Sequence, residues 1–475
     1  NAEDLSALGG KTAATVTVSN AVNIQGTEAQ VTAALVTDDT KVVAANATVA
    51  LDDGETPSIT QLNNIAAAAG VVTASLAANS LSNLGALTTA GTDQITITVN
   101  DANATNLNAE DLSALGGKTA ATVTVTNAVN ISGTQAQLTA ALVTAETKVT
   151  AANANVTLDD GSNLTIDQFD GINAALTGGG TFAYTISDTA ANITTANNAA
   201  ATKFNNATAL TVVDDGGTTG SSLNLNNATT ANLTSVTITG DAGADVVQLS
   251  SALTSSNIVT MDFVSDDGSA QEDKLIFNLT DSSNYITFDS SGNVITEGGR
   301  PTAFTFNKFS NFDLASGEDK FGVFYDEGGG AGFQNATGAF KEITDATANA
   351  AYRLRDGIVY EDTFNSDGDV VSAAAFNAAA IRSNMGSFIN AGGTATAMTQ
   401  GSDDLDFTYV LYARSSSTED ADSVQSAYIY AGTYTGQSQG VNSFDASKLS
   451  IIGLAEIVGV TEGDLQDAFI TTNPF

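Results

Sequence analysis

The first 46 residues of the chain occur twice. Residues 1–46 align without gaps with residues 108–153, and the two stretches differ at only seven positions. The same frame continues, since residues 46–54 match residues 153–161. An internal duplication of this kind is typical of repeat proteins, in which each unit buries its apolar face only by stacking on a neighbour. The chain must therefore build at least two adjacent copies of one structural unit.

A shorter period lies inside the duplication. Short runs in which β-branched residues alternate with others predict half-buried strands, and a polar corner and an Ala/Leu-rich stretch such as 27–35, with helical spacing, follow the strand. We therefore expect a mainly β fold: a repeat β-solenoid with short helical turns in each coil, in which stacked Asn and Thr side chains form ladders. Tandem β-sandwich domains are the alternative, although the coils are too short for seven strands each. The predicted strands are 14–18, 47–51, 72–76, 95–99, 121–125, 154–158, 182–186, 210–213 and 236–239.

Three regions are expected along the chain. Residues 1–250 would form the β-solenoid of roughly nine coils, residues 251–345 a β region, and residues 346–475 a β-rich C-terminal cap. Phe and Tyr become frequent after residue 251, and the segments 407–413 and 427–431 have strand composition. A helix is expected within 371–390. The aromatic residues are expected to form core.

The position of Asn1 within the repeat bears on association. Asn1 corresponds to Asn108, which follows the strand 95–99 of its own coil, so the sequence starts in mid-coil. We expect either a fragment of a longer protein, which we prefer, or a first coil that another subunit completes. An uncovered end of a stack exposes strand edges, which are association sites.

The charge of the chain restricts its partners. Asp and Glu number 53 against 15 Lys and Arg, which gives a formal net charge of -38. Such a surface repels nucleic acid and anionic membranes and attracts divalent cations, and the apolar runs are too short to span a bilayer. Cys and His are absent, which excludes Ser-His-Asp triads, cysteine nucleophiles and the usual zinc sites. We therefore do not expect an enzyme; a β-helix polysaccharide lyase is the remote alternative.

Acidic turns recur along the chain, mostly as Asp-Asp-Gly. Adjacent carboxylates beside a glycine suit Ca²⁺, which takes six to eight oxygen ligands. The same tripeptide is also ordinary turn chemistry, and that alternative stays open for any single turn. The candidate calcium ligands are Asp52, Asp53, Asp159, Asp160, Asp214, Asp215, Asp241, Asp245, Asp266, Asp267 and Asp273.

One segment resembles a known family. Gly240, Gly243, Asp245 and Val247 match the glycine-rich nonapeptide of RTX, or haemolysin-type, calcium-binding proteins, whereas Asp241 stands where that family has a second glycine. The coils are similar to repeats of large bacterial adhesins and surface-layer proteins. The resemblance implies calcium binding and type I secretion to the bacterial cell surface or medium. The acidic and apolar tail 464–475 is similar to the C-terminal signal of that route.

These features together predict an extracellular structural protein. Copies of the chain would assemble into a surface layer, sheath or filament, with calcium at the acidic turns. The alternative is a secreted adhesin that binds glycan or another cell through its C-terminal half. Its candidate binding residues are Tyr409, Tyr412, Tyr428 and Tyr430.

Overall fold

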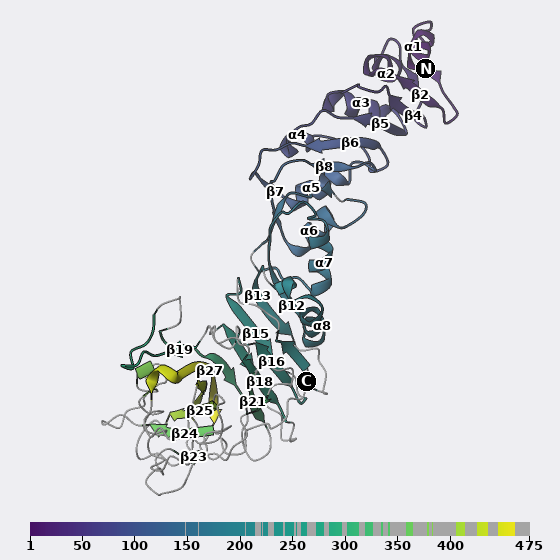
Figure 1. Cartoon of the computed structure of the whole chain (residues 1–475). Helices are drawn as coiled ribbons and strands as arrows, with labels where there is room; N and C mark the ends of the chain where they lie inside the picture. The colour runs from purple at the N-terminus through teal and green to yellow at the C-terminus, as the bar shows by residue number, and fades with distance from the viewer. Residues whose placement is uncertain are drawn as a thin grey trace. The chain divides into compact units, whose positions relative to one another are not determined.

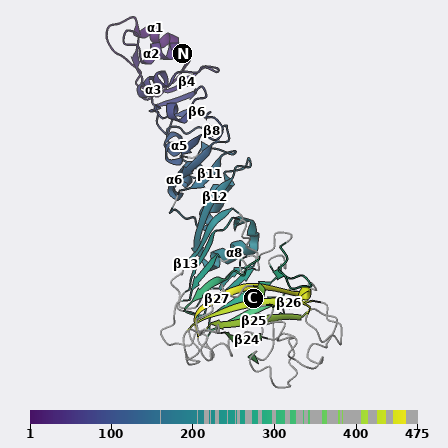
Figure 2. The same cartoon turned by 90° about the vertical axis from the view of Figure 1, so that its left-hand side faces the viewer.

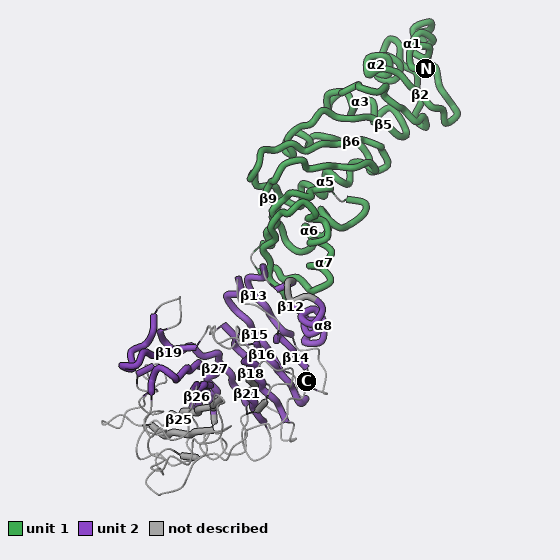
Figure 3. The backbone as a smooth tube through the Cα atoms, in the orientation of Figure 1, with its two compact units in different colours: residues 1–186 green, residues 187–475 purple. Residues whose placement is uncertain are grey.

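The computed structural model of the chain divides into two compact units, residues 1–186 and 187–475 (Figure 3). Each unit is described by itself. The expected boundaries at residues 250 and 345 separate regions of different sequence composition, and they stay predictions. The structure describes residues 1–213 apart from positions 148, 160 and 205, and beyond them 220, 222–226, 232–240, 243–250, 253, 258–263, 272–279, 285–296, 302–312, 319–325, 334–335, 341–342, 358–363, 378–379, 382, 405–413, 425–435 and 445–460.

Helices form a substantial part of the first unit. In Figure 2, α3, α5 and α6 lie along one side of this unit, beside strands β4, β6 and β8. Their buried residues are mostly Leu, Ile, Val and Ala. The helices of this unit are α1 (Ala2–Gly9), α2 (Glu28–Leu35), α3 (Ile59–Ala68), α4 (Leu81–Leu84), α5 (Ala109–Gly116), α6 (Gln135–Leu142) and α7 (Ile166–Ala174).

Capping fixes where several of these helices begin. The Thr27 hydroxyl accepts a hydrogen bond from the Gln30 backbone N–H, and the Gln30 side chain accepts one from the Thr27 N–H. This reciprocal capping box satisfies two backbone donors that a helix start otherwise leaves unpaired. Ser58 and Gln61 do the same for α3. Helices of only two or three turns are marginal alone, so caps and packing must stabilise them.

The strands of the first unit lie in parallel sheets. β1 and β3 form a two-stranded sheet. A six-stranded sheet has the order β10-β8-β6-β5-β4-β2, and β7, β9, β11 and β12 pair in that order. The N-terminal half of β6 pairs with β5 and its C-terminal half with β8. Strands β5 and β8 are therefore offset from each other along β6. The strands are β1 (Val16–Thr17), β2 (Asn23–Gly26), β3 (Val42–Val43), β4 (Thr48–Leu51), β5 (Val71–Ser75), β6 (Gln94–Val99), β7 (Asn106–Asn108), β8 (Val123–Val125), β9 (Asn130–Gly133), β10 (Val149–Thr150), β11 (Asn155–Leu158) and β12 (Phe182–Thr189).

An asparagine ladder crosses three neighbouring strands of this unit, as the repeat predicts. The Asn130 side-chain amide donates to Asn106 Oδ1 at 3.0 Å, and the Asn155 amide donates to Asn130 Oδ1 at 3.2 Å. Thr181 closes the ladder, because its hydroxyl and its backbone N–H both donate to Asn155 Oδ1. These bonds hold the parallel strands in one register.

The second unit combines parallel and antiparallel strands (Figure 1). β14, β16, β18 and β21 form a parallel sheet with β22 at its edge, and β13, β15, β17, β20 and β27 form a second parallel run. β27 and β26 pair antiparallel, as do β26 and β25. The remaining pairs are parallel between β23, β24 and β25 and antiparallel between β19 and β27.

The elements of the second unit have the following bounds. The helical segments are α8 (Ala190–Ala200), η1 (Ala201–Phe204) and η6 (Ala446–Lys448). The strands are β13 (Ala207–Val213), β14 (Ser222–Leu225), β15 (Ser235–Thr239), β16 (Val246–Ser250), β17 (Val259–Asp262), β18 (Lys274–Leu279), β19 (Ile286–Thr287), β20 (Asn307–Ser310), β21 (Lys320–Tyr325), β22 (Gln334–Asn335), β23 (Lys341–Glu342), β24 (Ile358–Thr363), β25 (Leu405–Ala413), β26 (Gln425–Tyr434) and β27 (Leu449–Val460).

Aromatic side chains fill the core of the second unit, as expected from its composition. Phe277 and Phe309 meet edge to face with ring centroids 6.2 Å apart, and the Phe263 and Phe312 centroids lie 4.8 Å apart. All four rings are buried. Such pairs contribute beyond the area that they bury.

The predicted fold class is wrong. The described structure is mixed α/β with parallel sheets. A mainly β solenoid would need short helical turns and one regular row of strands on each face. Instead α1, α3, α5, α6 and α7 have two or more turns, β6 divides its pairing, and the strands separate into several sheets. The predicted strand positions themselves are confirmed, because a strand lies within or across each of the nine runs.

Candidate functional site

The candidate calcium ligands divide into those that the structure describes and those that it does not. Asp52, Asp53, Asp159, Asp245 and Asp273 are described. Among the described residues, no group of three Asp, Glu, His or Cys side chains lies close enough to hold a metal ion. The other candidates lie outside the described residues: Asp160, Asp214, Asp215, Asp241, Asp266 and Asp267.

The first Asp-Asp-Gly sequence forms a tight turn. The Glu55 N–H donates to the Asp52 carbonyl at 3.2 Å, and Gly54 adopts a φ of 87°, a left-handed conformation that glycine adopts at little cost. Asp53 is exposed, whereas Asp52 is half-buried. The Glu55 carboxylate accepts a hydrogen bond from the Glu28 N–H at 3.1 Å, at the start of α2. These contacts are those of a turn that also supports a helix start.

The two candidate aspartates of the second unit are buried. Asp245 is 1% and Asp273 4% exposed, and a third aspartate that the sequence analysis missed, Asp319, is 6% exposed. The Asp245 N–H donates to the Asp273 carboxylate at 2.6 Å, and the Asp273 N–H donates to the Asp319 carboxylate at 2.9 Å. The structure thus places these aspartates in a ladder, in which the carboxylates of Asp273 and Asp319 each accept a backbone hydrogen bond from the preceding aspartate.

The ladder has a sequence signal that could have revealed Asp319. Each of the three aspartates immediately precedes a strand of the same parallel sheet: β16, β18 and β21. The signal is therefore an aspartate directly before each of several successive apolar strands. Unlike the Asp-Asp-Gly turns, it requires no adjacent glycine.

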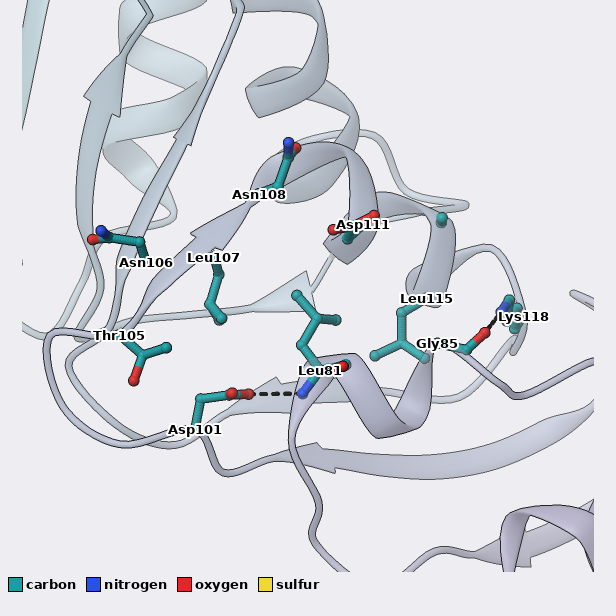
Figure 4. Close-up of a pocket in the computed structure, with 12 residues that line it drawn as sticks. Leu81, Gly85, Asp101, Thr105, Asn106, Leu107, Asn108, Asp111, Leu115 and Lys118 are labelled. Atoms are coloured by element: carbon teal, nitrogen blue, oxygen red, sulfur yellow. Dashed lines mark hydrogen bonds between the residues drawn. The ribbon is translucent and has the colours of Figure 1, made fainter.

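One pocket of about 540 Å³ lies between α4, β7 and α5 (Figure 4). Leu81, Leu107 and Leu115 point towards one another in it. The Asp101 carboxylate accepts the Leu81 N–H at 2.7 Å, and the Lys118 amino group donates to the Gly85 carbonyl at 2.8 Å. Because these charged groups bond to the backbone of the pocket wall, they hold the wall together. The pocket lies in the contact between residues 79–107 and the start of the second copy of the repeat, which they cover. We call this contact the seam.

The duplication provides an internal comparison for that seam. In the second copy, Leu115 is 1% exposed, whereas its equivalent in the first copy, Leu8, is 50% exposed. Four further apolar residues are buried in the second copy and only half-buried in the first. We call the first-copy residues the N-terminal face: Leu5, Leu8, Val16, Val18 and Val22, with second-copy equivalents Leu112, Leu115, Val123, Val125 and Val129.

Strand pairing explains the difference in exposure. In the second copy, β8 lies between β6 and β10, and β9 lies between β7 and β11. In the first copy, the equivalent strands β1 and β2 each lie at the edge of a sheet. In the described structure, the N-terminal face therefore combines two sheet edges with partly exposed apolar side chains.

The aromatic candidates of the C-terminal half differ in accessibility. Tyr430 is fully buried, and its ring packs edge to face on Phe304 and Phe306 at centroid distances of 5.0 and 5.1 Å. Tyr428 is half-buried against Phe306, and its hydroxyl lies 3.5 Å from Glu456 Oε1. Tyr409 and Tyr412 belong to β25. Tyr430 thus contributes to the core of the unit.

Comparisons with protein-family models, with curated proteins and with solved structures found no match to this chain. The likeness of residues 240–248 to the RTX nonapeptide stays a prediction from the sequence. Of the described helices, none has the length and apolar character needed to cross a membrane.

Proposed function

We propose that this protein is an extracellular structural protein whose copies assemble into a surface layer, sheath or filament. The observation that carries the proposal is the internal duplication, in which residues 108–153 repeat residues 1–46, because stacked copies of one unit bury their apolar faces only against a neighbour. The predicted secretion to a bacterial surface, from the RTX resemblance, belongs to the same proposal.

Calcium at the acidic turns is the second part of this proposal. Its support is the net charge of -38, because bound cations relieve the repulsion between copies. The exposed carboxylates of Asp53 and Asp159 are the described groups to test.

Light scattering with negative-stain imaging tests the proposal. We expect the full chain to form ordered assemblies in millimolar calcium and to lose them in excess chelator. Leu8→Asp should reduce assembly, because it places a charge on the N-terminal face. Val143→Asp is the matched control, since Val143 is a 40% exposed valine in the same unit but outside that face. A chain that stays monomeric with and without calcium contradicts the proposed function.

A further inference from the structure

The second unit buries amide side chains on one of its parallel sheets, in which β14, β16 and β18 are neighbours (Figure 3). Asn224 of β14 lies opposite Gln248 of β16, and Gln248 lies opposite Ile276 of β18. Asn278 follows Ile276 by two residues and therefore projects from the same face of the sheet. Gln248 is only 2% exposed and Asn278 is fully buried. This face of the sheet thus carries polar amides at buried positions.

Hydrogen bonds connect these amides with one another and with α8. Asn197 of α8 is 1% exposed, and its side-chain amide donates to Asn224 Oδ1 at 3.5 Å. Asn224 Oδ1 also accepts the Asn226 N–H at 2.9 Å, and the Asn278 amide donates to Asn226 Oδ1 at 2.5 Å. Because Gln248 is the cross-strand neighbour of Asn224, these side chains form one group. We call it the amide cluster: Asn197, Asn224, Asn226, Gln248 and Asn278.

Three oxygens of the amide cluster are buried and have no hydrogen-bond partner in the described part of the chain. They are Asn197 Oδ1, Gln248 Oε1 and Asn278 Oδ1. The hydrogen bonds of the cluster fix the orientation of the amides, since turning the Asn278 amide over would set its oxygen against Asn226 Oδ1. Buried polar atoms in proteins are nearly always hydrogen-bonded, and an exception indicates a bound water molecule or ion. All three atoms are acceptors, so the group that completes them must present positive charge or hydrogen-bond donors.

The chemistry of the cluster favours a cation of single charge. A metal ion can bind three neighbouring oxygens together, whereas a water molecule has only two hydrogens to donate. The side chains of the amide cluster are uncharged, and calcium and magnesium sites in proteins normally include carboxylates. Uncharged carbonyl oxygens are sufficient to replace the hydration shell of potassium. The net charge of -38 also raises the concentration of cations near the chain.

We propose that the amide cluster binds a monovalent metal cation, sodium or potassium. Asn197 Oδ1, Gln248 Oε1 and Asn278 Oδ1 are its side-chain ligands. The ion offsets the cost of burying these oxygens without hydrogen bonds, and it connects α8 with strands β16 and β18. The site belongs to the second unit alone, and it does not depend on assembly of copies or on calcium at the acidic turns.

Hydrogen exchange of the full chain in different chloride salts tests the proposal. Sodium, potassium and tetramethylammonium chloride are compared at equal ionic strength, with a chelator present to remove calcium. Exchange in β14, β16 and β18 should be about tenfold slower in the sodium or the potassium salt, once that cation is at about ten times its dissociation constant. Exchange in β4 and β5 of the first unit should be the same in all three salts, since screening of the net charge depends on ionic strength.

Variants at two positions distinguish the ligands from their neighbours. Asn197→Ala should remove the difference between the salts. Asn198→Ala is the matched control and should keep it, because Asn198 is the next residue of α8 and is exposed. Gln248→Met removes the amide oxygen at nearly constant side-chain length and should also remove the difference. Gln248→Glu should enlarge it, because the cation then pairs with a buried carboxylate that is costly when unpaired. The helix variant Asn197→Ala keeps the test decisive if the strand variants do not fold.

Three results would overturn the proposal. Equal exchange of β14, β16 and β18 in all three salts would assign the buried oxygens to water. A difference between the salts that survives in both Asn197→Ala and Gln248→Met would place the bound cation elsewhere. Protection of these strands when calcium replaces the chelator, with none from sodium or potassium, would show that the class of ion is wrong.

Discussion

At the scale of single residues, the duplication places identical side chains in different surroundings. Leu115 packs in the seam beside Leu81 and Leu107, whereas Leu8 is half in solvent. Residue type and local sequence are the same at the two positions. The contribution of each leucine to the free energy of unfolding therefore depends on whether a segment such as residues 79–107 covers it.

Leu115→Ala and Leu8→Ala form a matched pair. Leu115→Ala should lower the free energy of unfolding by about 2–5 kcal/mol, the usual cost of removing a buried leucine side chain. Leu8→Ala should cost less than about 1 kcal/mol, since an exposed side chain gains little from folding. Denaturant unfolding of the two variants beside the unmodified chain measures both values. Equal losses would contradict the difference in burial.

Burial also predicts a pH effect at Tyr184. Its ring packs on Phe169 and Phe182 at centroid distances of 4.5 and 4.8 Å, and this burial, with a smaller effect of Asp170, raises the pKa of its phenol. Below the unfolded-state pKa of about 10 the stabilisation is fully present. As the pH rises above that value towards the folded-state pKa, the unfolded state loses its proton first and stability falls. Tyr184→Phe should flatten this alkaline decline in unfolding free energy between pH 8 and 11; an unchanged decline would contradict the assignment.

At the scale of elements, side-chain ladders and helix caps hold parallel strands and short helices in place. Asn130 is the central member of the asparagine ladder, with bonds to Asn106 and Asn155. Its first-copy equivalent, Asn23, is exposed in the edge strand β2. The ladder should therefore stabilise the second copy more than the first.

Asn130→Ala and Asn23→Ala test the ladder. Asn130→Ala should destabilise the chain by about 1–3 kcal/mol, because it leaves partly buried ladder partners without their hydrogen bonds. Asn23→Ala should change stability by less than about 0.5 kcal/mol, as surface substitutions usually do. Thermal unfolding, combined with hydrogen exchange in β7, β9 and β11, measures the effect. A loss of stability that is the same in both variants would show that the ladder adds nothing.

The elements also show how much the sequence could predict. Alternating β-branched residues gave the strand positions, and Thr27 to Leu35 gave α2. The other helices were underestimated because Ala-rich stretches of two turns have weak periodicity, although Ser58 and Gln61 carry a capping-box signal. The separation into several sheets could not be predicted, because it depends on the divided pairing of β6, which no local pattern specifies.

The candidate site was predictable only in part. The alignment of Asn1 with Asn108 identifies the equivalent residues of the two copies, but which leucines and valines are buried depends on tertiary packing. Asp245 and Asp273 were identified as acidic residues of interest. They are buried, and the Asp245 N–H donates to Asp273 and the Asp273 N–H to Asp319, because strands that are far apart in the sequence lie side by side.

At the scale of the whole molecule, the net charge of -38 opposes contact between copies. The N-terminal face differs from this average, because its five residues are Leu and Val and carry no charge. Long-range repulsion and short-range apolar attraction therefore act in opposite directions on assembly. Salt weakens the repulsion, since the Debye length falls to about 10 Å at 0.1 M ionic strength.

Comparing calcium, magnesium and sodium chlorides at equal ionic strength distinguishes screening from specific binding. If calcium binds at the acidic turns, assembly should appear in millimolar calcium and not in sodium chloride of the same ionic strength. Asp53→Asn with Asp159→Asn should raise the calcium concentration needed, if these exposed carboxylates are ligands. Light scattering during titration gives each midpoint. Identical midpoints in all three salts would leave screening as the whole effect and contradict calcium binding.

The near-identity of the two copies has a consequence for folding. In a chain that has not yet reached its native state, residues 79–107 can pair with either of two almost identical segments. One is residues 1–26 and the other is residues 108–133. The native pairing is favoured by connectivity, because residue 107 is joined directly to residue 108. At high protein concentration, the same segment can reach residues 1–26 of another unfolded chain, as in domain swapping. Refolding yield should therefore fall with protein concentration. The duplication repeats one stable unit, but its first copy also competes with the second for pairing with residues 79–107.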